Sequence, residues 1–153
     1  MPVVTDMLPN DLINFTRGAS GPHVAQLQDV AKAMSGYNQA TPVSITTVGN
    51  GVITAAGMAA GVVLRSGPTA NYADAMDTAA HILAAFPGAV VGSSYRFRVV
   101  NSVAFTNTVT AGSGNTLAGT TAIAASTWRD YIVTFTNVTT AAATITGIGS
   151  GTL

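Results

Sequence analysis

The chain has 153 residues and a formal net charge of zero, and only 8% of its residues are charged, against about 25% in an average globular protein. This length fits one domain with an appended arm, and the five arginines are scattered among aspartates without the basic stripe that nucleic-acid binding requires. The absence of cysteine excludes disulfides and thiolate metal sites.

Residues 1–19 are expected to form an extended arm. They contain Pro2 and Pro9, and they lack the apolar periodicity of a packed helix or strand. We expect this arm to lie on a neighbouring subunit or on another partner, with Leu12 and Phe15 as its anchors.

Neither a targeting segment nor a membrane span is expected. Asp6 and Asp11 stand where a signal peptide needs a basic start followed by an unbroken apolar run. The longest apolar segments elsewhere are interrupted by Gly, Thr or Arg. These features predict a soluble protein that is made and kept in the cytoplasm.

The segment SGPHVAQLQDVAKAMSGYN predicts the first of two short helices. Pro22 fits a first helical position, and Gly36 marks the end. One narrow seam carries four apolar residues, namely Val24, Leu27, Ala31 and Met34. Two heptads are too few for a coiled coil, so docking on its own domain is the favoured interpretation and contact with another subunit is the alternative. Arm and helix together make up residues 1–41.

A β domain is predicted for residues 42–153, where the apolar period becomes that of strands. VSITTV and VITAAG are expected to pair around the turn residues Asn50 and Gly51, and MAAGVVLRSGP to supply another strand. The segment DTAAHILAAFPG predicts one inserted helix near residues 77–86, with Asp77 as its N-terminal cap.

Beyond residue 90 the sequence predicts only short strands. SYRFRVVN and RDYIVTFTNV alternate between apolar and polar residues, so each strand has one core-facing side. The expected core residues are Tyr95, Phe97, Val99, Tyr131, Val133 and Phe135, and the expected outward residues are Arg96, Arg98, Ile132 and Thr134. About five short strands separated by turn signals predict a mainly β fold, an antiparallel sandwich or a barrel, with a jelly roll possible.

The stretch FTNTVTAGSGNTLAGTTAIAASTW has no charged side chain. Monomeric proteins usually protect exposed strand edges with Lys or Pro, and neither residue occurs between Ser93 and Leu153. The edges are therefore closed into a barrel or covered by partners.

The sequence does not predict an enzyme or a cofactor. Asp77 and His81 have the spacing at which helical side chains meet, but no nucleophile or second carboxylate is placed beside them. Two isolated histidines make a poor metal site. Arg96, Arg98 and Arg129 are expected to be solvated or paired locally, with Asp130 as a partner; pairing with a partner's carboxylates is the alternative.

A resemblance covers more than half of the chain. RSGPTANYADAMDTAAHILAAFPGAVVGSSYRFRVVNS and TVTAGSGNTLAGTTAIAASTWRDYIVTFTNVTTAAATIT resemble a module of virion proteins of tailed bacteriophages. The shared pattern is an Arg-Ser-Gly-Pro turn, a capped Ala-rich helix, a GxSYRFRVxN strand, and an AGSGxTLxG hairpin before a TFTNV strand.

The resemblance implies a non-enzymatic structural protein, a capsid decoration or cement protein that binds the outside of a phage head and stabilises the shell. A fibre, tail or receptor-binding module is the alternative. We expect a homotrimer on the capsid surface, with the major capsid protein as partner and no nucleic acid, membrane or small-molecule substrate. The expected assembly contacts are Leu12, Phe15, Val24, Leu27, Met34, Arg96 and Arg98.

Overall fold

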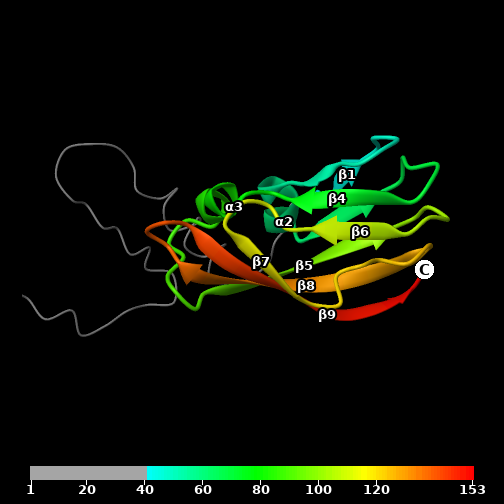
Figure 1. The fold of residues 1–153 in the computed structure, drawn as a ribbon. Helices are drawn as coiled ribbons and strands as arrows, with labels where there is room; N and C mark the ends of the chain where they lie inside the picture. Colours follow the sequence, from blue (N-terminus) through cyan, green and yellow to red (C-terminus); the bar gives the residue numbers. More distant parts are fainter. Residues whose placement is uncertain (1–40) are drawn as a thin grey trace, which may run out of the picture. The chain divides into compact units, whose positions relative to one another are not determined.

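The computed structural model describes residues 41–153 (Figure 1). The predictions for the arm and the first helix, with Leu12, Phe15, Val24, Leu27 and Met34, lie outside the described residues. The described strands are β1 (Val43–Ile45), β2 (Val52–Ile53), β3 (Val62–Arg65), β4 (Tyr72–Met76), β5 (Ser94–Asn101), β6 (Asn107–Thr110), β7 (Asn115–Gly119), β8 (Thr127–Asn137) and β9 (Ala142–Thr152). The described helices are α2 (Ala55–Ala60) and α3 (Ala79–Ala85), and neither is long and apolar enough to cross a membrane.

The strands form two sheets that share one apolar core. The larger sheet has the strand order β1-β3-β5-β8-β9-β7, and the smaller has the order β2-β4-β6. The core joins residues of both sheets and of α2, for example Val63 from β3, Met76 from β4 and Met58 from the helix. This arrangement confirms the predicted mainly β, sandwich-like fold.

Successive strands from β1 to β7 alternate between the two sheets, so the chain returns to each sheet by way of the other (Figure 1). As a result β1, β3 and β5 run parallel in the larger sheet, and β2, β4 and β6 run parallel in the smaller one. Between named strands, the expected antiparallel pairing occurs for β5 with β8 and β8 with β9, while β7 runs parallel to β9. An isolated antiparallel bridge also joins Asn107 and Ile123. A crossover through another layer brings the chain back in its original direction, whereas a direct reversal inverts it.

Two predicted hairpins are wrong for the same reason. The strands on either side of Asn50 and Gly51 belong to different sheets, and so do β6 and β7 on either side of the AGSGN turn. Both connections instead pack against β4 or the residues after it. Asn50 accepts a hydrogen bond from the Ala73 amide at 2.9 Å, and a Cβ on Gly112 would lie 2.2 Å from the Met76 carbonyl oxygen.

Two features of the helices differ from the prediction, namely the presence of α2 where a strand is expected and the residue that caps α3. α2 occupies residues that were assigned to a strand, and it lies between the Thr54 cap and Gly61, whose φ of 82° ends it. α3 confirms the helix predicted near residues 77–86, but Thr78 is its cap, not Asp77. The Asp77 carboxylate instead accepts hydrogen bonds from the amides of Ala55 at 2.9 Å and Thr78 at 2.8 Å, so it joins the starts of both helices.

The predicted faces of β5 and β8 are confirmed. Five of the six expected core residues are buried and the sixth, Tyr95, is half-buried, whereas Arg96 is exposed. Phe97 and Tyr131 are paired across the two strands and stack with their ring centroids 5.2 Å apart. This stacked pair fixes which face of the larger sheet points outward, and therefore where the arginines lie.

Candidate functional site

The outward face of β5 and β8 carries a cluster of one carboxylate between two guanidinium groups. Arg98 donates from Nε and Nη2 to the two oxygens of Asp130, at 2.7 and 2.9 Å, and Arg96 donates from Nη2 to one of them. The Asp130 side chain is 3% exposed, against 63% for Arg96 and 39% for Arg98. The local pairing with Asp130 that the sequence predicts is confirmed for Arg96 and Arg98, and it leaves one positive charge in excess. Arg129 instead donates from Nε to the backbone oxygen of Ala122 at 2.7 Å.

Arg98 and Asp130 each stabilise the charged form of the other. The hydrogen bond from Arg98 lowers the pKa of Asp130 below its usual range, although burial of the carboxyl acts in the opposite direction. The same hydrogen bond raises the pKa of Arg98. Asp130 is therefore ionised at neutral pH, and it holds Arg98 more tightly than Arg96, which makes only one hydrogen bond to it.

An aromatic platform lies directly beside the cluster. The Arg98 guanidinium carbon is 3.7 Å from the centroid of the Trp128 ring, a cation–π contact. Trp128 covers Gly151 of the neighbouring strand, where a Cβ would lie 2.7 Å from the indole. Glycine at this position lets the indole lie against the strand, so the platform depends on β9 as well as on β8.

Apolar side chains and a hollow border the same cluster. Leu64, Val100 and Trp128 are register partners on three adjacent strands, and all three are partly or fully exposed. A hollow of about 290 Å³ lies next to them, lined by Gly61, Val62, Arg96, Phe97, Arg98 and Asp130. We name the two arginines, Asp130, Trp128 and this hollow the arginine face. It combines an excess positive charge, an aromatic surface and room for a side chain.

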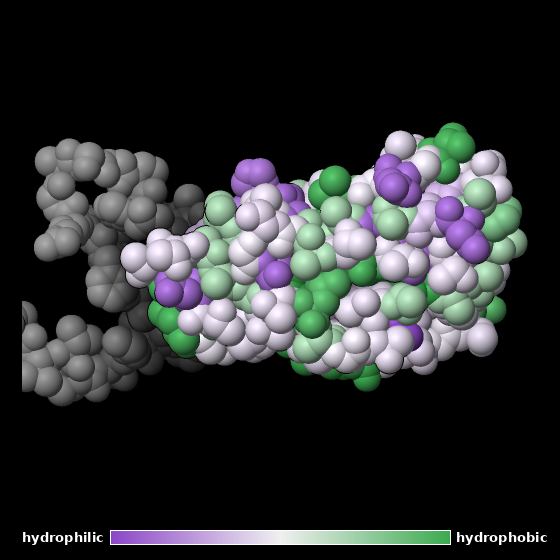
Figure 2. Space-filling view, in the orientation of Figure 1, coloured by the Kyte–Doolittle hydropathy of each residue, from purple (hydrophilic) through white to green (hydrophobic). Residues whose placement is uncertain are grey.

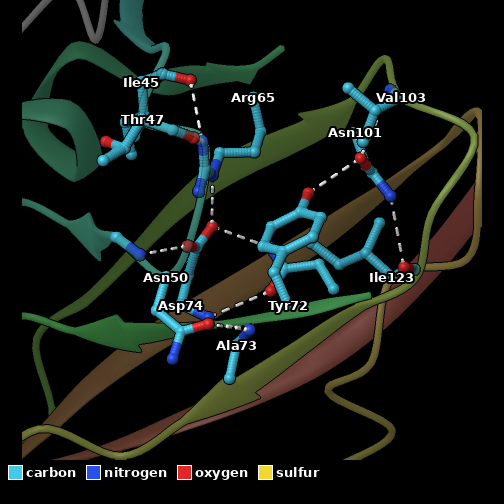
Figure 3. Close-up of polar contacts among 12 residues, drawn as sticks. Ile45, Thr47, Asn50, Arg65, Tyr72, Ala73, Asp74, Asn101, Val103 and Ile123 are labelled. Carbon is cyan, nitrogen blue, oxygen red and sulfur yellow. Dashed lines mark hydrogen bonds and ion pairs between the residues drawn. The ribbon is translucent and has the colours of Figure 1, made fainter. Parts of the chain in front are cut away.

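A second ion pair is buried and structural (Figure 3). Arg65 and Asp74 are both 0% exposed, and Arg65 Nε donates to Asp74 Oδ2 at 2.9 Å. The remaining guanidinium donors reach the backbone oxygens of Ile45 at 3.2 Å, Thr47 at 2.6 Å and Gly49. Arg65 therefore holds the loop between β1 and β2 against the sheets.

The other members of this network are also bonded inside the protein. Asp74 also accepts hydrogen bonds from the Gly51 amide at 2.7 Å and from Asn107 Nδ2 at 2.9 Å. The guanidinium carbon of Arg65 lies 4.7 Å from the centroid of the Tyr72 ring, and the Tyr72 hydroxyl donates to Asn101 Oδ1 at 2.8 Å (Figure 3). Because the charges are paired and hydrogen-bonded inside the protein, we assign this network to the stability of the fold.

Sequence reasoning missed the buried pair, although the nine-residue spacing of Arg65 and Asp74 across a Ser-Gly-Pro turn was visible. An arginine at the end of an apolar strand, followed by a turn and an isolated aspartate on the next strand, was the available signal. Its interpretation requires knowing that the two strands lie in facing sheets.

The Asp77 and His81 pair exists but has a structural explanation. His81 Nδ1 lies 2.7 Å from Asp77 Oδ1, and the imidazole is 68% exposed. Burial raises the pKa of Asp77, but hydrogen bonds from the Ala55 amide, His81 and the Thr78 amide outweigh it and lower the pKa overall. Among residues 41–153 no three His, Asp or Glu side chains form a group that could hold a metal ion.

The exposed strand edges form the other candidate surface. β1 and β7 are the outermost strands of the larger sheet, and β2 and β6 those of the smaller. None of these four strands contains a charged residue. In Figure 2 strongly hydrophilic residues form a few separate spots on a surface of mostly intermediate hydropathy. The exposed large apolar residues are Val48, Val52, Leu64, Val90, Val91, Ile148 and Leu153.

No protein-family model matches the chain, and searches of curated proteins and of solved structures found no significant match.

Proposed function

We propose that this protein is a non-enzymatic virion structural protein, a decoration or cement protein that binds the outside of a phage head and stabilises the shell. The observation that carries the proposal is the uncharged edge of the larger sheet at β7 (Asn115–Gly119). No charged residue occurs from Val99 to Trp128, which includes this strand and its flanks. The virion context comes from the resemblance of residues 65–148 to phage virion proteins.

An unprotected edge strand suits a protein that is covered in its working state. On its outer side β7 pairs with no other strand of the described residues, so its backbone N–H and C=O groups there can pair with a strand of another chain, which gives affinity without charged side chains. Repetition over a symmetric shell then multiplies modest contacts, since every copy meets the same neighbours. A homotrimer that contacts the major capsid protein fits this picture.

The test is binding of the purified full-length protein to phage heads that lack it, measured by co-sedimentation. We expect saturable binding and a higher temperature of shell disruption. Replacing Thr116 of β7 with Lys places a charge on the exposed edge and should reduce binding. Thr139→Lys puts the same charge at an exposed turn and serves as the matched control. Absence of binding, or equal loss in both variants, would count against the proposal.

A fibre, tail or receptor-binding module is the second candidate. The parallel stacking of β1, β3 and β5, and of β2, β4 and β6, favours it, because winding between parallel sheets is how solenoid proteins extend. The two candidates differ in location. Antibody labelling of intact virions would place a decoration protein over the head and a fibre module at the tail or its tip.

A further inference from the structure

The charges of the described residues do not balance on the outward face of the larger sheet. Residues 41–153 contain four arginines and three aspartates, which is an excess of one positive charge with neutral histidine. Asp74 forms an ion pair with the buried Arg65, and Asp130 forms ion pairs with both Arg96 and Arg98. Arg96 is 63% exposed, and within residues 41–153 its side chain makes one hydrogen bond, to Asp130, which leaves most of its donors available for an anion.

The complementary charge lies in the first residues of the same sequence. Residues 1–16 contain Asp6 and Asp11 and no basic side chain, which gives this stretch two negative charges. The third aspartate before residue 41, Asp29, is matched in charge by Lys32 three residues later in the sequence. Arg17 follows this stretch directly and offsets one of its charges, so residues 1–17 account for the net charge of −1 of residues 1–40.

We propose that the arginine face binds residues 1–16 of a neighbouring copy of this chain. The inference rests on the homo-oligomer of the proposed function and names the surface that receives the arm. A carboxylate of Asp6 or Asp11 accepts hydrogen bonds from the free donors of Arg96. The hollow of about 290 Å³ admits the side chain, and the exposed row of Leu64, Val100 and Trp128 offers contact to apolar residues of the arm, such as Leu12.

The contribution of each carboxylate is modest, because the receiving arginines are largely exposed. Exposed ion pairs of this kind change an equilibrium by about two- to fivefold. Because one of the two carboxylates bonds to Arg96, removing both should weaken the contact about two- to fivefold. The remaining affinity comes from apolar contact with the platform, and only the charged part falls with added salt.

The fluorescence of Trp128 reports binding to the arginine face, since this residue is the only tryptophan of the chain and lies in that face. A synthetic peptide of residues 1–16 contains no tryptophan, so it can be titrated into the full-length Asp6→Asn, Asp11→Asn variant while Trp128 emission is followed. We expect a saturable change. The peptide with both aspartates replaced by asparagine should bind about two- to fivefold more weakly.

A double-mutant comparison assigns the effect to the proposed contact. Arg96→Gln in the receiving chain should weaken binding of the acidic peptide and leave binding of the asparagine peptide unchanged. In the full chain without peptide, Asp6→Asn with Asp11→Asn should reduce concentration-dependent association, measured by light scattering. Asp29→Asn changes the charge in the same direction and should not reduce it.

Three results would overturn the inference: equal affinity of the two peptides, an Arg96→Gln effect on both peptides, or a Trp128 signal in the unmodified chain that does not depend on protein concentration. The last would place the arm on its own copy. Each of these results is compatible with binding to phage heads, which is measured separately, so failure here is distinguishable from failure of the proposed function.

Discussion

Replacing Asp74 with Asn tests the assignment of the buried ion pair to stability. The substitution keeps the shape of the side chain but removes the one carboxylate that residues 41–153 place on Arg65, which is 0% exposed. The two carboxylate oxygens of Asp74 now accept hydrogen bonds from Arg65, Gly51 and Asn107. In the Asn variant one of these oxygens becomes an NH₂ group, which cannot accept from those donors. A buried charge is left without its counter-ion, a change that costs about 3–5 kcal/mol.

That cost is a large part of the 5–15 kcal/mol by which domains of this kind are usually stable. We therefore expect the urea midpoint of Asp74→Asn to fall strongly, with an unchanged dependence on urea concentration. Asp130→Asn is the matched control, because its partners Arg96 and Arg98 reach water and the loss should be about 1 kcal/mol. If Asp74→Asn is no less stable than Asp130→Asn, the buried network does not hold the fold in the way described.

Three further predictions address the core, a turn and the response to alkali. Phe97→Ala should destabilise the protein by about 3–5 kcal/mol, whereas Arg96→Ala should leave the thermal midpoint nearly unchanged; the reverse order would invert the two faces of the sheet. Gly112→Ala should lower the thermal midpoint, because its Cβ would lie 2.2 Å from a carbonyl oxygen of Met76, and an unchanged midpoint would disprove that close approach. Burial raises the pKa of Tyr72 to about 12, while an unfolded tyrosine ionises near 10, so stability should fall as pH rises from about 10 to 12. Tyr72→Phe should be less sensitive to alkali, and an identical pH profile would refute this.

The two long antiparallel strands could be predicted from sequence, because their pattern is local. Alternation in SYRFRVVN and RDYIVTFTNV marks one face of each strand as apolar, and burial of Phe97 and Phe135 beside the exposed Arg96 follows from it. The pairing of Arg98 with Asp130 is also predictable, since opposite charges on the outward faces of adjacent strands meet when the register allows it.

The path of the chain between the sheets could not be predicted in this way. Asn50 and Gly51 are the usual residues of a two-residue hairpin, but here they lead from one sheet to the other and are held by Ala73 and Asp74. The six-residue helix α2 is too short and too rich in Ala and Gly to give a periodic signal. Burial of Arg65 depends on backbone oxygens 16 to 20 residues away, which are brought near only by the fold.

Electron microscopy of phage heads mixed with the purified full-length protein tests the proposed role most directly. We predict additional density on the outside of the shell at symmetry-related positions, with three copies around each local threefold axis. Thr116→Lys should lower its occupancy relative to Thr139→Lys, because the β7 edge is the surface proposed to be covered. Heads that stay bare at saturating protein, or density confined to the tail, would contradict a decoration protein.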